Sequence, residues 1–361
     1  MTTARQIVYV GTYTEGWGNP VPRDEGIFVY AFDPSNGSLK FLRTINGVRN
    51  PSFLTVTQDY IFSVNELSEF KGVFGSGATA INRATGQIIN QQPTHGADSC
   101  NIILDPSGRW LFTANYTSGS ITVFPVQTNG QLGEAVQVVQ DHGHGANPER
   151  QEGPHVHCVA FAPDGRYVFA SDLGLDQIKI FTLDPSSGQL TPNDPPFAPT
   201  KPGAGPRHFL FHPNGRYFYA TTELSATVAV FAYDAARGAL TPLQTIPTLP
   251  ADYTGKNLTA DIHIASSGRF LYVSNRGHDS IVVYAIDAET GQLTLVEFIS
   301  ADGKTPRNFA FDLTERYLLV AHQDSASLAT FHVDQASGKL APTGERVSLP
   351  YPVCVKVVPD V

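Results

Sequence analysis

Short runs of alternating or contiguous apolar positions follow one another along the whole chain, separated by turns rich in Gly, Pro, Asn and Asp. Such runs are typical of β-strands joined by tight turns. The pattern disfavours helical bundles and doubly wound folds, which need long amphipathic helices between their strands. No apolar run approaches the ~18 residues of a membrane span, so no membrane partner is expected.

An apolar strand followed by a turn that ends on glycine recurs seven times. The turn glycines lie 44 to 58 residues apart, and glycine supplies the positive φ that a tight hairpin needs. A second strand precedes each of these, as in FAPDGRYVFASD (161–172) and FHPNGRYFYATT (211–222). Four short strands in ~40–50 residues are the signature of a β-propeller blade. The seven copies are IFVYAFDPSNG (27–37), ATAINRATG (78–86), ITVFPVQTNG (121–130), IKIFTLDPSSG (178–188), VAVFAYDAARG (228–238), IVVYAIDAETG (281–291) and LATFHVDQASG (328–338).

The two ends of the chain complement each other. The first copy begins with IVYVGTY (7–13) and lacks a first strand, whereas PYPVCVKVVPD (350–360) resembles that missing strand. We therefore expect the C-terminal segment to complete the first blade and close the ring, which removes exposed sheet edges. The sequence predicts an all-β, seven-bladed propeller with four-stranded blades, formed by residues 1–361 as a single domain.

Composition narrows the classes of function. Charged residues make up 16% of the chain, against about 25% in an average soluble protein, and the net charge is −9. Without a basic stripe, nucleic acid is not an expected partner. Residues 1–10 lack the regions of a signal peptide, and three Cys cannot form a disulfide framework, so we expect a cytoplasmic protein. Phosphate-loop, dinucleotide and zinc motifs are absent from the sequence, so no cofactor and no metal are predicted.

Equivalent positions of the seven copies carry different polar residues. In a propeller the first strand of each blade lines the channel, and the connections at one end form a funnel that is the default ligand site. Several blades are therefore expected to direct different polar groups at one axis. The positions just before the first strand hold Ser52, Cys100, His157, Arg207, Ala260, Arg307 and Val353, and those at the end of the second strand hold Tyr13, Glu66, Tyr116, Leu173, Glu223, Arg276 and Gln323.

Each of these polar groups also has a structural interpretation. His155 and His157 are expected to alternate on one strand and could share a metal ion, but no third ligand has diagnostic spacing. Glu223 could simply neutralise nearby arginines, and the three cysteines are expected to be small buried residues. His142 and His144 lie in the Gly-rich segment DHGHGANPERQEG (141–153) and are expected to be solvated or part of a lid.

An ordered set of motifs resembles the seven-bladed propeller lactonase family, which includes propeller-type 6-phosphogluconolactonases and carboxymuconate cyclase. The motifs are GTYT, NPERQEGPHVH, GAGPRHFLFHPNGRY, TELSATVAVF, ADIHI, SNRGHDSI and TPRNFAF, and the resemblance runs from about Ile7 to the C-terminus. It implies catalytic roles for His157, Arg207, Glu223 and Arg276. Because the motif holds two histidines, His155 remains an alternative to His157. Thr222 stands where the family more often has Asn.

Lactone hydrolysis needs a base that activates water and a cation at the developing oxyanion. His157 suits the first role, with Glu223 as its orienting group or as the base itself, while Arg207 and Arg276 suit the second. Substrate-binding residues are expected to include His155, His208, Asp261, His263, Arg307 and Glu66. A small anionic lactone, most simply 6-phosphogluconolactone, is the expected substrate. Lactone formation from a muconate-type acid and a non-catalytic binding platform are the alternatives, and the oligomeric state is left open.

Overall fold

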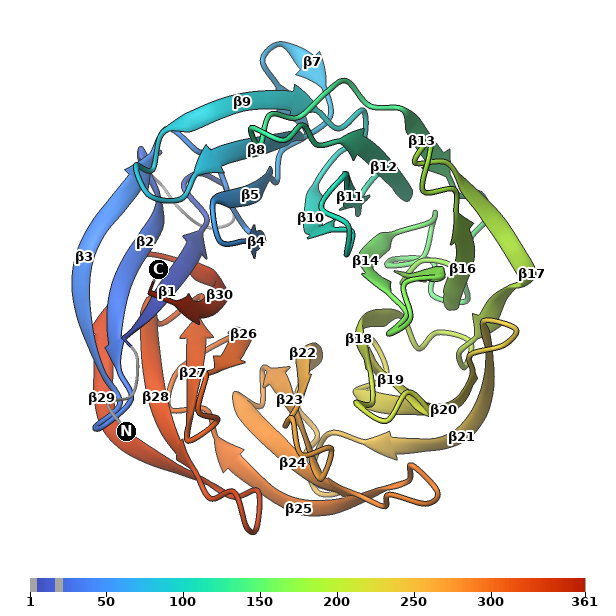
Figure 1. Cartoon of the computed structure of the whole chain (residues 1–361). Helices are drawn as coiled ribbons and strands as arrows, with labels where there is room; N and C mark the ends of the chain where they lie inside the picture. The colour runs from blue at the N-terminus through green and yellow to red at the C-terminus, as the bar shows by residue number, and fades with distance from the viewer. Residues whose placement is uncertain (1–4, 17–21, 361) are drawn as a thin grey trace. The chain divides into compact units, whose positions relative to one another are not determined.

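The computed structural model describes residues 5–16 and 22–360, and these form seven four-stranded antiparallel sheets (Figure 1). The fold class is the predicted all-β, seven-bladed propeller with four-stranded blades. In each sheet the strands pair in chain order, apart from the first sheet, which takes one strand from the C-terminus. Among the described residues no helix is long and apolar enough to cross a membrane.

The strand bounds follow the repeat. The first sheet contains β1 (Gln6–Thr12), β2 (Glu25–Asp33), β3 (Ser38–Asn46) and β30 (Pro352–Pro359), and the second contains β4 (Leu54–Val56), β5 (Tyr60–Asn65), β8 (Gly77–Asn82) and β9 (Ile88–Pro93). The third and fourth contain β10 (Ser99–Leu104), β11 (Trp110–Asn115), β12 (Ser120–Pro125), β13 (Gln137–Gln140), β14 (Val156–Phe161), β15 (Tyr167–Asp172), β16 (Gln177–Leu183) and β17 (Leu190–Pro199). The remaining three contain β18 (Pro206–Phe211), β19 (Tyr217–Thr222), β20 (Thr227–Asp234), β21 (Ala239–Pro247), β22 (Leu258–Ile264), β23 (Phe270–Arg276), β24 (Ser280–Ile286), β25 (Leu293–Ser300), β26 (Pro306–Phe311), β27 (Tyr317–His322), β28 (Ser327–Val333) and β29 (Leu340–Ser348).

The chain divides into two compact units. The first consists of residues 1–52 and 247–361, and the second of residues 53–246. We describe each unit by itself, and the expectation of a single domain over residues 1–361 stays a prediction. Residues 1–4, part of the segment in which we expect no signal peptide, lie outside the described residues.

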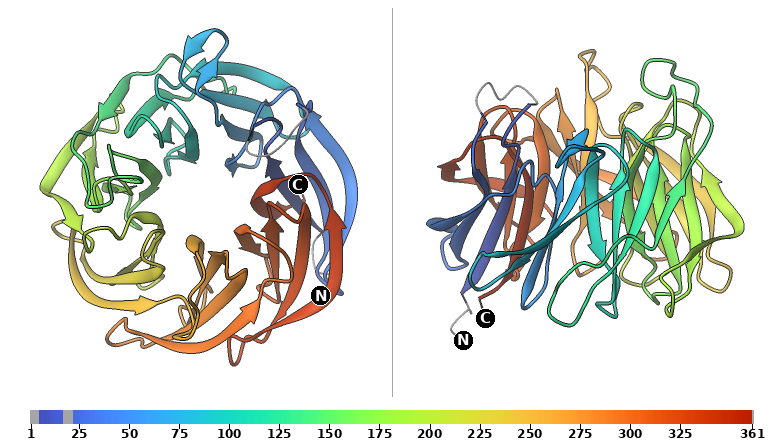
Figure 2. Two further views of the ribbon diagram at one scale, coloured as in Figure 1. Left: turned by 180° about the vertical axis from the view of Figure 1, so that it is seen from behind. Right: turned by 90° about the horizontal axis from the view of Figure 1, so that it is seen from above.

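The first sheet joins the two ends of the chain, as predicted. β30 pairs antiparallel with β1 (Figure 2). In this pairing Val10 lies opposite Val355. Val8, Val10 and Val355 are buried in one apolar cluster with Tyr30 and Phe32 of β2. The C-terminal segment therefore supplies the strand that the first copy of the repeat lacks.

The second sheet departs from the other copies. Its first strand, β4, has only three residues. A small hairpin of β6 (Glu69–Phe70) and β7 (Val73–Phe74), which the repeat did not predict, is inserted between β5 and β8 (Figure 1). Phe70 is buried, whereas the side chain of Phe74 is exposed.

A β-bulge falls near the start of the first strand in six of the seven sheets. His157 is the bulged residue between Val156 and Cys158, and Arg207 and His208 share the bulge of β18. A bulged residue leaves the strand pairing and its side chain is re-aimed, which is why bulges are frequent beside active sites. The other bulges contain Cys100, Ala260 with Asp261, Arg307 and Val353. The structure places inside the strands five positions that were predicted just before them: Cys100, His157, Arg207, Ala260 and Arg307.

Neighbouring sheets within each unit are held together by a repeated Arg-aromatic pair at the start of the second strand. The Arg166 guanidinium donates a hydrogen bond to the carbonyl of Ala235 in the next sheet (2.6 Å), and the Tyr167 hydroxyl donates to Ala236 (3.1 Å). Arg109 and Trp110 both donate to the carbonyl of Pro185. The same arrangement joins Arg269 to Ala336 and Arg316 to Pro34.

The hairpin glycine of the next sheet lies against each of these aromatic rings. Gly188 has φ +74°, and a Cβ at this position would come within 2.5 Å of the Trp110 ring. Gly238 meets Tyr167 in the same way, and Gly338 meets Phe270. Glycine is therefore required at these turns both for its backbone conformation and for the close approach of the ring.

Replacing Gly188 by Ala is expected to destabilise the protein more than replacing Gly215 by Ala. Both glycines have positive φ, but a Cβ on Gly215 would meet nothing within 4 Å. The left-handed conformation costs a non-glycine residue about 1–2 kcal/mol in either variant. The clash with Trp110 should add about 1–3 kcal/mol to Gly188→Ala alone. Urea-unfolding midpoints of the two variants measure this difference, and equal midpoints would contradict the inter-sheet role of Gly188.

Candidate functional site

A buried carboxylate held between two guanidinium groups forms the centre of the candidate site in residues 53–246. Glu223 directly follows β19, and its Oε2 accepts a hydrogen bond from Nε of Arg207 at 2.9 Å. Its Oε1 accepts one from Nη2 of Arg150 at 2.7 Å. The Arg207 and Glu223 side chains are only 3% and 5% exposed. Two positive charges thus share one negative charge, which leaves this cluster cationic.

Arg150 comes from the Gly-rich segment 141–153, which connects β13 and β14. Gln151 is fully buried and braces this segment: its side chain donates to the carbonyl of Leu173 and accepts from the backbone N–H of Asn147, both at 2.8 Å. Arg150 itself also donates from Nη2 to the Tyr116 hydroxyl. Burial lowers the pKa of Arg150, but hydrogen bonds to Tyr116 and Glu223 and the charge of Glu223 outweigh this effect and raise it.

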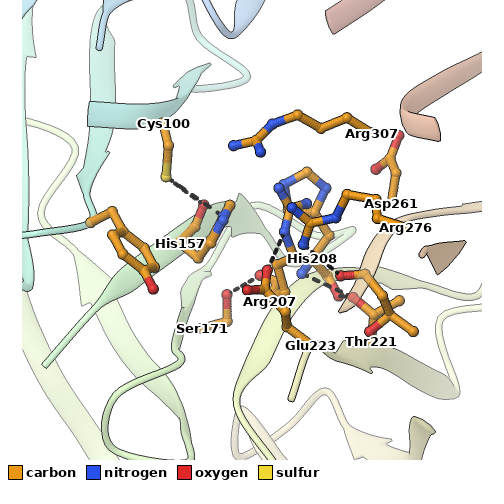
Figure 3. Close-up of polar contacts among 12 residues, drawn as sticks. Cys100, His157, Ser171, Arg207, His208, Thr221, Glu223, Asp261, Arg276 and Arg307 are labelled. Carbon is orange, nitrogen blue, oxygen red and sulfur yellow. Dashed lines mark hydrogen bonds and ion pairs between the residues drawn. The ribbon is translucent and has the colours of Figure 1, made fainter. Parts of the chain in front are cut away.

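His157 lies in a pocket of rings and a thiol. Its Nδ1 is 3.6 Å from Sγ of Cys100, and the thiol also donates to the carbonyl oxygen of His157 at 3.5 Å. Tyr116 and His208 each pack edge-on against its ring, with centroid distances of 5.4 and 5.3 Å. Figure 3 shows His157 close to His208 and to the Arg207–Glu223 pair. The structure thus brings together His157, His208, Arg207 and Glu223.

His155 has a different environment, because β14 begins at Val156 and His155 precedes the strand. The expectation that the two histidines alternate on one strand is therefore wrong. The ring of His155 stacks on Tyr116 with a centroid distance of 4.6 Å. Its Nδ1 lies 3.1 Å from the Tyr116 carbonyl oxygen and its Nε2 lies 3.2 Å from Oε1 of Glu152. Both ring nitrogens are therefore occupied by neighbouring protein groups.

Hydroxyl groups from β15 and β19 form hydrogen bonds with the backbone of the β18 bulge. The Thr221 hydroxyl accepts from the backbone N–H of His208 and donates to its carbonyl oxygen (Figure 3). The Ser171 hydroxyl donates to the carbonyl oxygen of Arg207. The backbone of the bulge is thereby satisfied without strand pairing, and the Arg207 and His208 side chains are held in place.

Asp261, His263, Arg276 and Arg307 lie in the other unit, among residues 247–361. Oδ2 of the buried Asp261 lies 3.0 Å from Nε2 of His263 and accepts hydrogen bonds from the Asn308 side chain and from the Phe309 backbone N–H. Asp261 therefore links the first strands of two neighbouring sheets. This structural role was not anticipated for it.

The two arginines of this unit also have identified contacts. Arg276 donates from Nη2 to the carbonyl oxygen of Thr259 at 3.2 Å. The guanidinium of Arg307 lies over the ring of Tyr13, 5.5 Å from its centroid, and Nη1 lies 3.5 Å from Oε1 of Gln323. Tyr13, Arg307 and Gln323 therefore form one group at the funnel positions predicted for the first and last sheets.

The remaining candidate positions behave as buried or solvated groups. Glu66 is buried directly after β5, and His142 and His144 are exposed, as expected for a solvated segment. The three cysteines are buried free thiols. Within the described part of the chain, no group of three or more His, Cys, Asp or Glu side chains is arranged to hold a metal ion.

Sequence reasoning did not assign a role to Arg150, although it lies within the quoted motif NPERQEGPHVH. Nor did it assign one to Tyr116, which contacts both candidate histidines and Arg150. For Tyr116 a signal existed, because it occupies one of the aligned funnel positions. For Arg150 the family motif was the only signal, because the segment that carries it has no counterpart in the repeat.

The buried side chain of Asp172 holds the backbone of His155, which follows the Gly-rich segment 141–153. Asp172 ends β15, and its Oδ1 accepts backbone N–H groups of His155 (2.8 Å) and Leu175 (3.1 Å). Burial, together with the charge of Asp141, raises the pKa of Asp172 to about 7. Asp141, the first residue of the segment, pairs with Lys179 at 2.9 Å. Asp172 therefore holds the backbone of His155 while remaining largely protonated below neutral pH.

Comparison with known proteins agrees with the fold and with the motif order. The family described as "Lactonase, 7-bladed beta-propeller" matches residues 7–357. The 6-phosphogluconolactonase of Bacillus subtilis (strain 168) is 36% identical over 99% of both chains. The structure of the periplasmic gluconolactonase of Pseudomonas aeruginosa superimposes with a TM-score of 0.90 at 39% identity, covering 98% of this chain and 99% of that one. A Bacteroides fragilis structure also has a TM-score of 0.90, at 35% identity and 99% coverage of both chains.

Asp172→Asn is expected to change how stability depends on pH. The folded protein retains the Asp172 proton up to about pH 7, whereas the unfolded chain releases it near pH 4, so this group lowers the free energy of unfolding as pH rises between these values. Between pH 5 and pH 8, the free energy of unfolding of the wild type should fall by about 2–3 kcal/mol more than that of Asp172→Asn. Urea unfolding at both pH values measures this change.

Asp184→Asn provides the control for this prediction. Asp184 lies in a hairpin of the same sheet, and hydrogen bonds from Ser187 and Ser186 lower its pKa to about 2. It is ionised throughout the range from pH 5 to 8, so its removal should leave the pH dependence unaltered. A parallel pH dependence of the wild type and Asp172→Asn would show that Asp172 is ionised in the folded protein.

Proposed function

The chain belongs to the seven-bladed β-propeller lactonase family, and we propose that it hydrolyses 6-phosphogluconolactone to 6-phosphogluconate. The observation that carries this proposal is the packing of His157 against His208, beside the Arg207–Glu223 pair. These side chains supply a base and a cation within one buried group, and hydrolysis of a lactone needs both.

His157 is the proposed general base. The alternative, His155, has Nδ1 against a carbonyl oxygen and Nε2 against Glu152, so its nitrogens are occupied. In His157 the Cys100 thiol lies at Nδ1, and we assign the proton transfer to Nε2. Nε2 removes a proton from water as the water oxygen attacks the lactone carbonyl carbon. The ring C–O bond then breaks, and the proton passes to the leaving ring oxygen.

Arg207 is the proposed cation that stabilises the oxyanion formed at the lactone carbonyl. Glu223 holds Nε of Arg207 and so fixes the plane of a side chain that is almost fully buried. A positioned cation stabilises the oxyanion without reorganising during the reaction, and its effect is strongest where water is excluded. With both oxygens bonded to guanidinium groups, Glu223 is better suited to positioning arginines than to acting as the base. The prediction that Arg276 is a further donor, and that Glu66, His208, Asp261, His263 and Arg307 bind substrate, stays a prediction.

The relatives guide the choice of substrate. One curated relative is a 6-phosphogluconolactonase and one solved relative is a gluconolactonase, so the two differ in whether the lactone carries a phosphate. The cationic cluster of Arg150, Arg207 and Glu223 favours an anionic lactone. A cytoplasmic location, which sequence reasoning favoured, remains part of the proposal.

Purified protein in the presence of EDTA is expected to accelerate hydrolysis of freshly prepared 6-phosphogluconolactone above the spontaneous rate. His157→Ala should lower kcat about 10²–10⁴-fold, because a general base is worth roughly this factor. Proton release in weakly buffered solution measures both rates. His144→Ala is the control, since His144 is exposed and lies outside the described group.

Several outcomes would overturn this proposal. An unaltered rate in His157→Ala would exclude His157 as the base. Activity that disappears with EDTA and returns with a divalent cation would replace the base mechanism by metal catalysis. Absence of any acceleration by the wild type would leave the family membership in place but remove hydrolysis of this lactone as the function.

A further inference from the structure

The guanidinium of Arg150 is anchored by only one of its three nitrogens. Nη2 donates to both Glu223 and the Tyr116 hydroxyl, whereas Nε and Nη1 make no hydrogen bond to any described residue. A guanidinium carries five N–H donors in a fixed planar fork. The Arg150 side chain is 36% exposed, against 3% for Arg207. One edge of the fork is therefore fixed to the protein and the rest is available to a ligand.

The segment that carries Arg150 is held in place by its own hydrogen bonds. The side chain of the buried Gln151 accepts a hydrogen bond from the backbone N–H of Asn147 and donates one to the carbonyl oxygen of Leu173. The backbone N–H of Gln151 donates to the carbonyl oxygen of Asn147 at 2.7 Å. At the start of the segment, Asp141 pairs with Lys179. Arg150 is thus positioned before any ligand arrives, which reduces the entropy lost on binding.

The charge of Arg150 is only partly balanced. Glu223 is shared with Arg207, and Glu152, on the same segment, pairs with Nε2 of His155. The complementary ligand is therefore an anion, and a planar fork binds the paired oxygens of a phosphate or a carboxylate in bidentate fashion. Because Glu223 joins Arg150 to Arg207, an anion on Arg150 would sit beside the group that we assign to the lactone carbonyl.

We propose that Arg150 is a specificity-determining residue that binds the terminal anionic group, phosphate or carboxylate, of the lactone substrate and of its product. The inference rests on the proposed function, since it takes the lactone to be held by the same group of side chains. It assigns Arg150 to the part of the ligand that does not react, and leaves the carbonyl to Arg207 and His157. It also explains why this chain carries an arginine on the segment before β14.

Binding of the open-chain acids tests the inference without depending on catalysis. Calorimetry with 6-phosphogluconate, glucarate and gluconate compares a terminal phosphate, a terminal carboxylate and a terminal hydroxyl. The wild type should bind one of the two acids with a charged terminal group, 6-phosphogluconate or glucarate, about 10–100-fold more tightly than gluconate, as expected for one bidentate charge-assisted contact. In Arg150→Gln that ratio should fall to about 1–2. Arg150→Lys keeps the charge but not the fork, and should give an intermediate ratio.

Arg237→Gln is the matched control, because Arg237 lies in an exposed hairpin of the same unit and should leave the ratio unaltered. Whichever of 6-phosphogluconate and glucarate binds more tightly identifies the anionic group as phosphate or carboxylate. A wild type that binds neither of these acids more tightly than gluconate, or a preference that survives Arg150→Gln, would overturn the inference. If the binding preference depends on Arg150 but no lactone is hydrolysed, the proposed activity fails and the anion site remains.

Discussion

The bulge near the start of the first strand is the constraint on which the candidate site depends. A regularly paired strand directs alternate residues to its two faces. In β15, for example, both faces are buried: Phe169 packs in one apolar cluster, and Val168 and Ala170 pack in another. A residue that leaves the pairing can carry a polar side chain without disturbing the packing of its neighbours. Cys100, His157, Arg207 and Arg307 all occupy such positions. One repeated backbone irregularity therefore gives six of the seven sheets a position at which the side chain can vary.

Much of the fold could be predicted from the sequence, because it is encoded locally. Turn glycines, strand periodicity and the two incomplete ends predict seven four-stranded sheets and the pairing of β1 with β30. The hairpin of β6 and β7 was missed, because its two short strands occur in only one copy. The starts of the first strands were misplaced, because a bulge interrupts the alternation of apolar and polar residues just where the strand starts. Bulged residues such as Arg207 were put before their strand, whereas His155 was put on a strand that begins one residue after it.

The candidate site was predictable only in part, because its contacts join distant segments. Aligning the copies selected His157, Arg207 and Glu223, but did not show that Glu223 pairs with Arg150, from which 73 residues separate it. The burial of Gln151 and of Asp172 is likewise set by tertiary packing. The two acids also differ in environment. Glu223 lies between the guanidinium groups of Arg150 and Arg207, whereas burial and the nearby Asp141 raise the pKa of Asp172 to about 7.

The pairing of β1 with β30 has a consequence for how the protein is made. β1 is synthesised before every other described strand and β30 after them, so the first sheet keeps one edge unpaired until β30 has been made. That edge carries the apolar residues Val8 and Val10 and could pair with other chains. Nascent chains are thus vulnerable to this pairing until β30 has been made. A chain that stops before β30 keeps the edge of β1 exposed permanently, which gives cellular quality control a feature by which to recognise it.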